Sequence, residues 1–202
     1  MPHPTEDRNY RLPAHVRPAA YDAMLSVDPE ARRFAGTLRV DLQLAEETAE
    51  LVLHAADLDV TGAQLRSGTT EVEPVAIAVA KASETVLLRF AAPIPRGPAS
   101  LALAWTGRMT GGLRGLYPAG DGIAATQFEA ADARRVFPCF DEPGFKAPWR
   151  LAVEAPAGVA VLSNGAPGSD EDLGGRRRIR FRAAAPPPTL PAAPVPGPPE
   201  AW

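Results

Sequence analysis

Metal-ligating and nucleophilic side chains are scarce in this sequence. It contains three histidines, His3, His15 and His54, and a single cysteine, Cys139. No H-E-x-x-H pair occurs, and no set of ligands has the spacing of a zinc site. A lone cysteine is more often a small buried apolar residue than a nucleophile, a role that would require the fold to bring it a base. We therefore expect no catalytic residue and no metal ligand in this chain.

One segment, residues 126–146, instead concentrates charge and aromatic rings. Its phenylalanines can anchor it to a core, while its carboxylates and guanidinium groups supply fixed charge. A plain connecting loop is usually small and polar, so a long loop of this composition indicates function. The aromatic residues are Phe128, Phe137, Phe140 and Phe145, and the charged ones include Glu129, Asp132, Arg134, Arg135, Asp141 and Glu142.

The overall composition, 46% hydrophobic and 22% charged, is typical of a globular protein. A net charge of −3 and a pI near 5.7 argue against nucleic acid or an anionic membrane surface as partner. A basic run at 176–182 follows an acidic run at 170–172, and the two charges offset each other locally. We expect the basic run to be the solvated face of a strand. The start lacks the apolar core of a signal peptide, and no apolar stretch is long enough to span a membrane. Together with the single cysteine, these features predict a cytoplasmic protein.

Alternating apolar and polar residues predict the strands that must position this segment. The clearest case is 36–44, where Leu38, Val40, Leu42 and Leu44 alternate with polar residues and therefore share one face. Proline- and glycine-rich turns separate such segments, which predicts an all-β fold, either an antiparallel sandwich or a saddle-shaped sheet. We expect at most a turn or two of helix, at 45–50 and 130–135. The other predicted strands are 21–27, 50–54, 58–65, 72–80, 85–90, 100–105, 149–154, 159–163 and 177–181.

The carboxyl-terminal residues differ from the rest of the chain. Eight prolines occur within residues 186–202, and proline lacks the amide proton that a sheet ladder needs. We therefore expect a β domain over residues 1–185, followed by an extended tail or linker of polyproline-II character over 186–202.

The charged and aromatic segment closely resembles the signature of the aminopeptidase N family of zinc metallopeptidases. The matching residues read T-Q-F-E at 126–129, D-A-R-R at 132–135 and F-P-C-F-D-E-P at 137–143. Further similarity occurs at Y-R-L-P (10–13), F-A-G-T-L (34–38), L-V-L-H-A (51–55) and L-R-G-L-Y (113–117). The resemblance extends over residues 8 to 190.

The resemblance implies a saddle-shaped amino-terminal domain that packs over a separate, thermolysin-like catalytic domain. The family's zinc ligands and its G-x-M-E-N motif belong to that catalytic domain, and neither occurs in this sequence. The T-Q-x-E segment of the family lines the first substrate pocket. The resemblance therefore assigns Glu129 to the substrate's α-ammonium group and Gln127 to the first side-chain pocket. Structural roles are assigned to Asp132, Arg134, Pro138, Cys139, Asp141, Glu142 and Pro143.

The sequence departs from the family pattern after residue 185, where prolines interrupt the place of an expected strand. The chain then ends at Trp202, before a catalytic domain begins. A natural truncation, a frame disruption or a boundary placed in a linker would each explain this.

We accordingly expect a fragment of a zinc aminopeptidase that is inactive alone. Its expected partners are a catalytic domain, in cis or in trans, and a peptide substrate, with no nucleic acid and no membrane. The alternative is a free-standing β-sandwich module that binds a protein, or itself, through the former interdomain face. An exposed apolar patch around 137–145 would mark that face.

Overall fold

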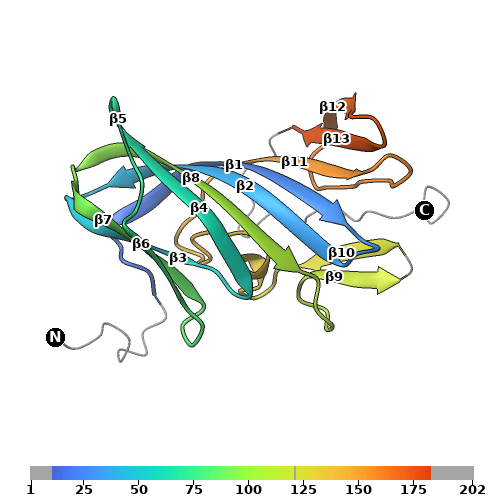
Figure 1. The fold of residues 1–202 in the computed structure, drawn as a ribbon, viewed down its shortest axis with the longest axis horizontal. Helices are drawn as coiled ribbons and strands as arrows, with labels where there is room; N and C mark the ends of the chain where they lie inside the picture. The colour runs from blue at the N-terminus through green and yellow to red at the C-terminus, as the bar shows by residue number, and fades with distance from the viewer. Residues whose placement is uncertain (1–10, 121, 183–202) are drawn as a thin grey trace.

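The computed structural model describes residues 11–120 and 122–182, in which strands predominate (Figure 1). The proline-rich tail and the boundary predicted at residue 185 lie outside the described residues. The strands are β1 (Val16–Asp28), β2 (Arg33–Leu44), β3 (Thr48–His54), β4 (Leu58–Ser67), β5 (Thr70–Val72), β6 (Ala76–Ala80), β7 (Thr85–Ile94), β8 (Gly97–Arg108), β9 (Gly115–Gly120), β10 (Ile123–Gln127), β11 (Trp149–Pro156), β12 (Pro167–Asp172) and β13 (Arg176–Phe181). One short 3-10 helix, η1 (Ala133–Arg135), lies in the charged segment.

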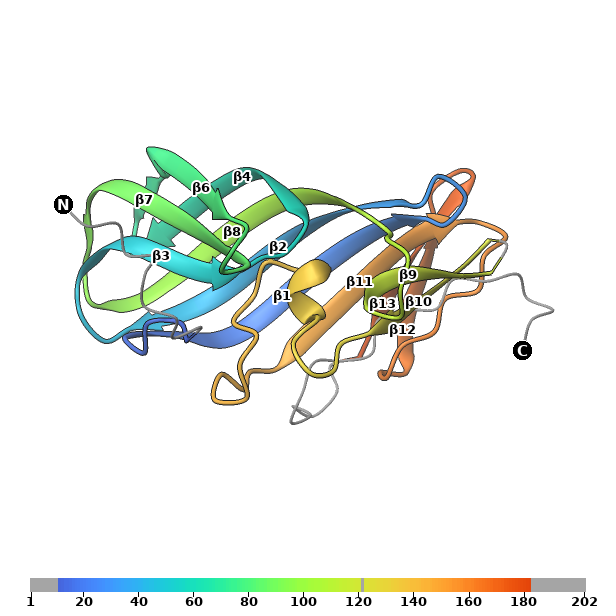
Figure 2. The same ribbon diagram turned by 90° about the horizontal axis from the view of Figure 1, so that it is seen from below.

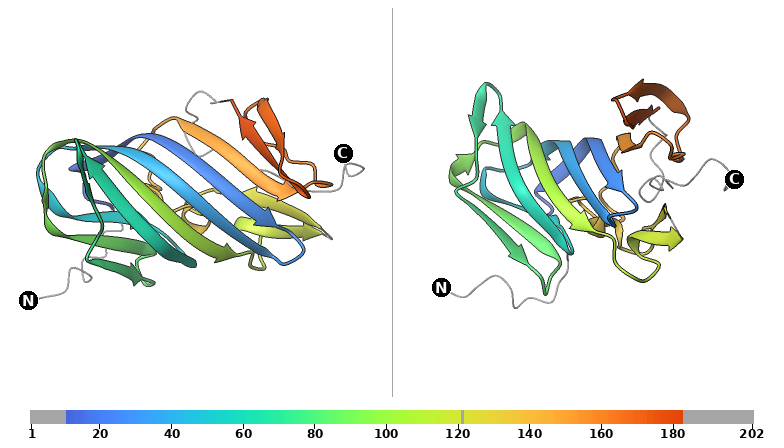
Figure 3. Two further views of the ribbon diagram at one scale, coloured as in Figure 1. Left: turned by 45° about the horizontal axis from the view of Figure 1, so that its top comes forward. Right: turned by 45° about the vertical axis from the view of Figure 1, so that its right-hand side comes forward.

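The strands form one large sheet and two small ones. The large sheet has the order β12-β13-β11-β1-β2-β8-β4-β5, and its pairs are antiparallel except for the parallel pair β1–β11. A three-stranded sheet, β3-β7-β6, lies over one end of it, and the β9–β10 hairpin lies near the other (Figure 2). Residues 128–148 run between these two small sheets across the same face. The large sheet is strongly twisted (Figure 3). Because strands predominate and the small sheets lie on one face of the large one, the predicted all-β sandwich is confirmed.

The predicted alternation is clearest in β2, where every second residue from Phe34 to Leu44 is buried and the residues between them are exposed or half-buried. Two glycines in the β2–β8 pair make room for large rings. Gly36 lies opposite Trp105, and a Cβ atom at Gly36 would approach the indole ring to 2.2 Å. Phe34 occupies the same kind of space over Gly107. Aromatic rings therefore fill the core side of this sheet by lying across glycine positions.

Several predicted elements differ from the structure. Residues 159–163 form no strand, because the chain turns after β11 and only an isolated bridge occurs at residue 160. The predicted strand 72–80 is split into β5 and β6 by a corner at 73–75. Residues 45–50 form a bend that leads into β3 rather than a helical turn. Strands β9, β10 and β12 were not predicted. Among the described residues, no helix has the length and apolar character that crossing a membrane requires.

Candidate functional site

Aromatic packing anchors the charged segment beneath the large sheet. Phe137 is 1% exposed, and its ring centroid lies 5.2 Å from that of Trp149, 6.1 Å from Trp105 and 6.2 Å from Phe128. The indole Nε1 of Trp105 donates a hydrogen bond of 2.9 Å to the carbonyl oxygen of Val136. The loop is therefore an integral part of the core.

The exposed apolar patch expected around residues 137–145 is consequently wrong. Phe137 and Phe140 are 1% and 4% exposed, and Phe145 is half-buried with its ring packed edge-on against Phe140. The rings that suggested an interdomain face instead fill the interior of this domain. Their burial is favourable because it removes their apolar area from water without any partner domain.

Backbone hydrogen bonds join this loop to the end of β3. His54 and Cys139 form an isolated antiparallel bridge, with N–H···O distances of 2.9 and 3.0 Å. The backbone N–H of Asp141 donates to Nδ1 of the buried His54 at 3.2 Å. The backbone N–H of Phe140 donates to the Tyr21 hydroxyl at 3.2 Å. His54, an isolated histidine in the sequence, is thus a packed residue that orders the loop.

The thiol of Cys139 lies in an apolar interior. The residue is 1% exposed, and burial raises the pKa of the thiol well above its usual value, with a further increase from Asp141. A thiol in this state stays protonated at neutral pH and is a poor nucleophile. The described residues also contain no group of three or more potential metal ligands. A zinc ion therefore has no fitting set of donors in the described part of the chain.

A buried ion pair closes the loop on itself. Arg134 is 7% exposed, and its Nε donates to Oδ2 of Asp141 at 2.9 Å, while its Nη2 donates to the Asp141 carbonyl oxygen at 3.1 Å. Its Nη1 lies 3.4 Å from a carboxylate oxygen of Glu84. Burial raises the pKa of Asp141, although the Arg134 guanidinium opposes this increase. The pair thus holds η1, which contains Arg134, against the later part of the loop at Asp141.

Arg135, the next residue, bonds the nearby carboxylate of Asp132 and two carboxylates from distant parts of the chain. Its guanidinium donates to Asp132 at 2.8 Å, to Asp57 at 2.5 Å and to Glu84 at 2.7 Å. Strand β9 approaches the same side chain closely, because Gly115 has a φ of +61° and a Cβ atom there would lie 2.8 Å from the Cβ of Arg135. The ion network therefore connects the loop with Asp57, before β4, and Glu84, before β7, while β9 packs against the Arg135 side chain at Gly115.

The remaining motif residues lie at the start and end of the loop. Oε1 of Glu142 accepts a hydrogen bond of 2.5 Å from the backbone N–H of Leu12, which attaches the chain preceding β1 to the loop. Pro138 is buried next to Cys139, whereas Pro143 is exposed in the turn that follows.

Gln127 and Glu129 differ from their neighbours because both side chains are exposed. Gln127 ends β10, and its Oε1 accepts hydrogen bonds from the backbone N–H groups of Phe128 (3.0 Å) and Glu129 (3.4 Å). The Gln127 side chain therefore holds the backbone on which Glu129 stands, a role that sequence reasoning did not identify. Within the described ranges, the Glu129 carboxylate forms no ion pair.

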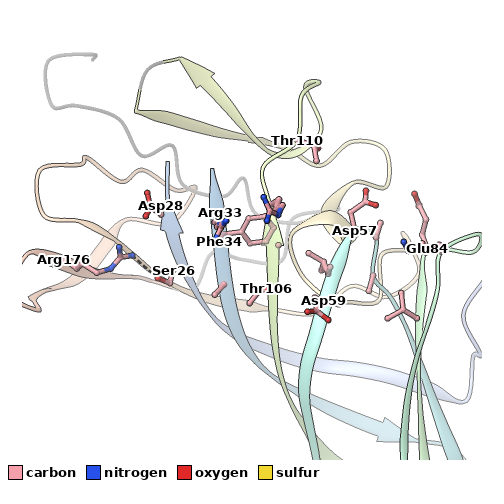
Figure 4. Close-up of a pocket in the computed structure, with 18 residues that line it drawn as sticks. Ser26, Asp28, Arg33, Phe34, Asp57, Asp59, Glu84, Thr106, Thr110 and Arg176 are labelled. Atoms are coloured by element: carbon pink, nitrogen blue, oxygen red, sulfur yellow. Dashed lines mark hydrogen bonds between the residues drawn. The ribbon is translucent and has the colours of Figure 1, made fainter. Parts of the chain in front are cut away.

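Neither residue lines the groove that the structure shows at the ends of β2, β4 and β8 (Figure 4). This groove has a volume of about 1020 Å³. Asp57 and Glu84, which pair with Arg135, stand on one side of it, and Arg33 and Phe34 lie in its middle. The groove thus adjoins the ion network, whereas the exposed Glu129 lies outside its lining.

Comparison with known proteins agrees with the signature. The chain is 37% identical over 161 residues to Aminopeptidase M1-B of Oryza sativa subsp. japonica, covering 76% of this chain and 18% of that protein. It is 36% identical over 181 residues to Aminopeptidase M1 of Arabidopsis thaliana, covering 84% and 20%. It is 32% identical over 162 residues to Aminopeptidase N of Acetobacter pasteurianus, covering 76% and 44%. The chain thus spans about a fifth of the length of these plant relatives.

The sequence model described as "Peptidase M1 N-terminal domain" matches residues 17–190. This range contains all the described strands except the first residue of β1, together with the T-Q-F-E and F-P-C-F-D-E-P motifs, and it confirms the resemblance seen in the sequence. The chain belongs to the peptidase M1 N-terminal domain family.

Proposed function

We propose that this chain acts as the non-catalytic amino-terminal domain of a zinc-dependent aminopeptidase. In this proposal it contributes Glu129, which binds the substrate's α-ammonium group, and Gln127, which lines the first side-chain pocket. The zinc and the hydrolytic residues belong to a catalytic domain that joins it in cis or in trans. The family membership and the names of the relatives support this assignment. A cytoplasmic location is part of the same proposal.

The observation that carries the proposal is an exposed, unpaired carboxylate on an ordered backbone. Glu129 follows Phe128, which is 8% exposed, and precedes the ion network of Asp132, Arg134 and Arg135. Both guanidinium groups are already paired with other carboxylates, so they do not neutralise Glu129. A carboxylate held in this way can accept charge-assisted hydrogen bonds from an ammonium group. Because its backbone is already held by the Gln127 side chain, binding has to order only the rotamers of the Glu129 side chain.

The solvent exposure of Glu129 also explains why the proposed role needs a catalytic domain to cover it. An ion pair in open water contributes only about 0–1 kcal/mol, which is too little to select a peptide's amino terminus. A hydrogen bond to a charged group in a water-excluding pocket contributes about 1.5–3 kcal/mol. Glu129 therefore becomes selective only when another domain covers it. We expect the isolated 202-residue chain to hydrolyse no aminoacyl p-nitroanilide, and sustained turnover by the pure chain would contradict the proposal.

A chimaeric enzyme tests the role of Glu129 directly. Residues 17–190 replace the matching region of the Arabidopsis aminopeptidase M1, and kcat/KM is measured with leucine p-nitroanilide. Glu129→Gln keeps the side-chain volume but removes the charge, and we expect kcat/KM to fall roughly ten- to a hundredfold, as 1.5–3 kcal/mol implies.

Two controls accompany this measurement. Glu71→Gln changes an exposed carboxylate on β5 and should leave kcat/KM unchanged. Inhibition by an amino-acid hydroxamate should weaken in Glu129→Gln, whereas inhibition by its N-acetylated form, which lacks the ammonium group, should not change. An unaltered kcat/KM in Glu129→Gln, from an active chimaera, would refute the assignment.

A further inference from the structure

Each nitrogen atom of the Arg135 guanidinium has a carboxylate of its own. Nε donates to Asp132, Nη1 to Asp57 and Nη2 to Glu84. Arginine presents these donors in one rigid plane, an arrangement that the single ammonium of lysine cannot reproduce. The Arg135 side chain is 18% exposed, so water competes little for the bonds. The family resemblance assigned this arginine no role.

Two of the three carboxylates stand on strained backbone. Asp57 and Glu84 have φ angles of +57° and +52°, in the left-handed region that residues other than glycine seldom adopt. They are two of the three non-glycine residues with a positive φ in the described part of the chain. Strained conformations persist where the surrounding structure holds them, and they cluster at functional sites. Both strained residues meet at a single arginine.

Arg135 also supports the base of the β9–β10 hairpin. Gly115 pairs with Gln127 in this hairpin, and a Cβ atom at Gly115 would lie 2.8 Å from the Arg135 Cβ. The Gln127 side chain in turn accepts hydrogen bonds from the backbone N–H groups of Phe128 and Glu129. A series of contacts therefore runs from the arginine through β9 and β10 to the backbone of Glu129.

A second series of contacts reaches Glu129 from the other side. Nε of Arg135 donates to Asp132 at 2.8 Å, and the backbone N–H of Asp132 donates to the carbonyl oxygen of Phe128 at 3.0 Å. Residues 128 and 132 are thus joined, and Glu129 lies in the turn between them. Arg135 therefore supports the backbone both before and after Glu129.

We propose that Arg135 is a positioning residue for the substrate-amine site, which fixes the place of Glu129 by holding the hairpin base and Asp132 together. This inference rests on the proposed contact between Glu129 and the substrate's α-ammonium group. Binding groups must be held within about 0.5 Å of their productive geometry. Glu129 is exposed and forms no ion pair among the described residues, so its backbone has to provide that precision. Arg135 itself does not touch the substrate.

Amide hydrogen exchange of the full 202-residue chain, measured by NMR, tests the support without any peptidase activity. Arg135→Met removes the donors but keeps an unbranched stem. Exchange at the hydrogen-bonded amides of Phe128 and Asp132 should become about tenfold faster, while the amides of β2 keep their rates and verify the fold. Arg89→Met, which removes an exposed ion pair with Glu50, is the matched control and should change none of these rates.

A pair of glycine variants disturbs the same contact from the hairpin side. Gly115→Ala places a methyl group against Arg135 at a φ of +61°. Gly122→Ala is its control, because Gly122 has a similar φ of +70° but nothing lies within 4 Å of a Cβ atom there. Exchange at Phe128 should become faster in Gly115→Ala and should not change in Gly122→Ala.

A double-mutant cycle in the chimaeric enzyme separates positioning from general damage. Arg135→Met should lower kcat/KM for leucine p-nitroanilide about tenfold when Glu129 is present. In the Glu129→Gln background it should lower kcat/KM by less than about twofold, because no carboxylate is left to place. Arg135→Lys, which keeps the charge but not the planar donors, should give an intermediate loss.

Equal losses in the two backgrounds, or unchanged exchange at Phe128 and Asp132 in Arg135→Met, would overturn the inference. If Arg135→Met does not fold, the same measurements on Arg135→Lys and Gly115→Ala decide. The two proposals fail in different ways. A chimaera in which Glu129→Gln has no effect refutes the proposed function, whereas one in which Glu129→Gln lowers kcat/KM and Arg135→Met does not refutes the positioning role alone.

Discussion

Replacing Arg134 should reveal the cost of leaving a buried carboxylate unpaired. Arg134→Met keeps most of the aliphatic stem but removes the guanidinium that bonds Asp141 at 2.9 Å and its carbonyl at 3.1 Å. The Asp141 side chain is 9% exposed, so water replaces the lost partner poorly. Breaking a buried pair costs about 3–5 kcal/mol. We expect the lower end, about 3 kcal/mol at pH 7, because the backbone N–H of Arg134 still reaches Asp141 at 3.3 Å.

The loss should depend on pH in a defined direction. Burial raises the pKa of Asp141 above its ordinary value of 3.8, even though Arg134 opposes the increase. A raised pKa in the folded state means that the contribution of Asp141 to stability is fully present below pH 3.8 and is lost as the pH rises through the folded-state pKa. Without Arg134 that pKa rises further. The penalty of Arg134→Met should therefore be small in acid and should grow towards neutral pH.

Urea unfolding of the full chain, followed by tryptophan fluorescence at pH 4.5 and pH 7, measures this penalty. The double variant Arg134→Met/Asp141→Asn should recover part of the lost stability at pH 7, because it removes the charge that lacks a partner. Arg134→Lys, which retains a positive charge, provides a milder comparison if Arg134→Met is unfolded at pH 7. If Arg134→Met lowered stability equally at both pH values, the loss would come from packing rather than from the unpaired charge. Effects of Arg134→Met and Asp141→Asn that simply add in the double variant would refute the reasoning in the same way.

Two further predictions concern the interior of the loop. Phe137→Ala removes a ring that is 1% exposed and contacts three others, and should lower the free energy of unfolding in urea by about 3–5 kcal/mol, whereas Leu113→Ala at an exposed site should change it by less than about 0.5 kcal/mol. The thiol of Cys139 should fail to react with Ellman's reagent in the native chain and should react fully in denaturant, as absorbance would show. Rapid labelling of the native chain would contradict its burial.

Strands with one buried face were predictable because their residues alternate, as those of β2 do. Strand β12 was not, because all six of its residues are exposed and it has no alternation to detect. It is held by pairing with β13 and by ion pairs of Arg177 with Asp170 and of Arg178 with Glu171. The sequence indicated that these charges offset each other, but no local pattern shows that the acidic run forms a strand.

Residues 159–163 show the opposite error. The segment has apolar residues in a strand-like spacing, yet only Val161 among them is buried. A strand requires a partner with free hydrogen-bonding groups, and the chain instead crosses from β11 to β12 here. Spacing alone does not supply that partner, because pairing depends on tertiary structure.

The candidate site was predictable in its residues but not in its connections. The resemblance assigned structural roles to Asp132, Arg134 and Asp141 but none to Arg135. Sequence reasoning did not show that Arg135 bonds Asp57 and Glu84, which are 78 and 51 residues away. The interpretation that the phenylalanines anchor the loop to a core is confirmed, whereas the exposed face at 137–145 that the alternative required is wrong. Composition left both open, because it does not distinguish a ring that fills the core of its own domain from one that fills a neighbour's.

The division of charge within this short loop connects the ion network with the proposed role of Glu129. Each guanidinium near it is saturated, Arg134 by Asp141 and Arg135 by Asp132, Asp57 and Glu84. An arginine that lacked these partners could pair with another carboxylate of the same segment, Glu129 included. In our proposal these four carboxylates therefore do more than fix the loop: by occupying both arginines, they leave the negative charge of Glu129 available to an ammonium group from outside.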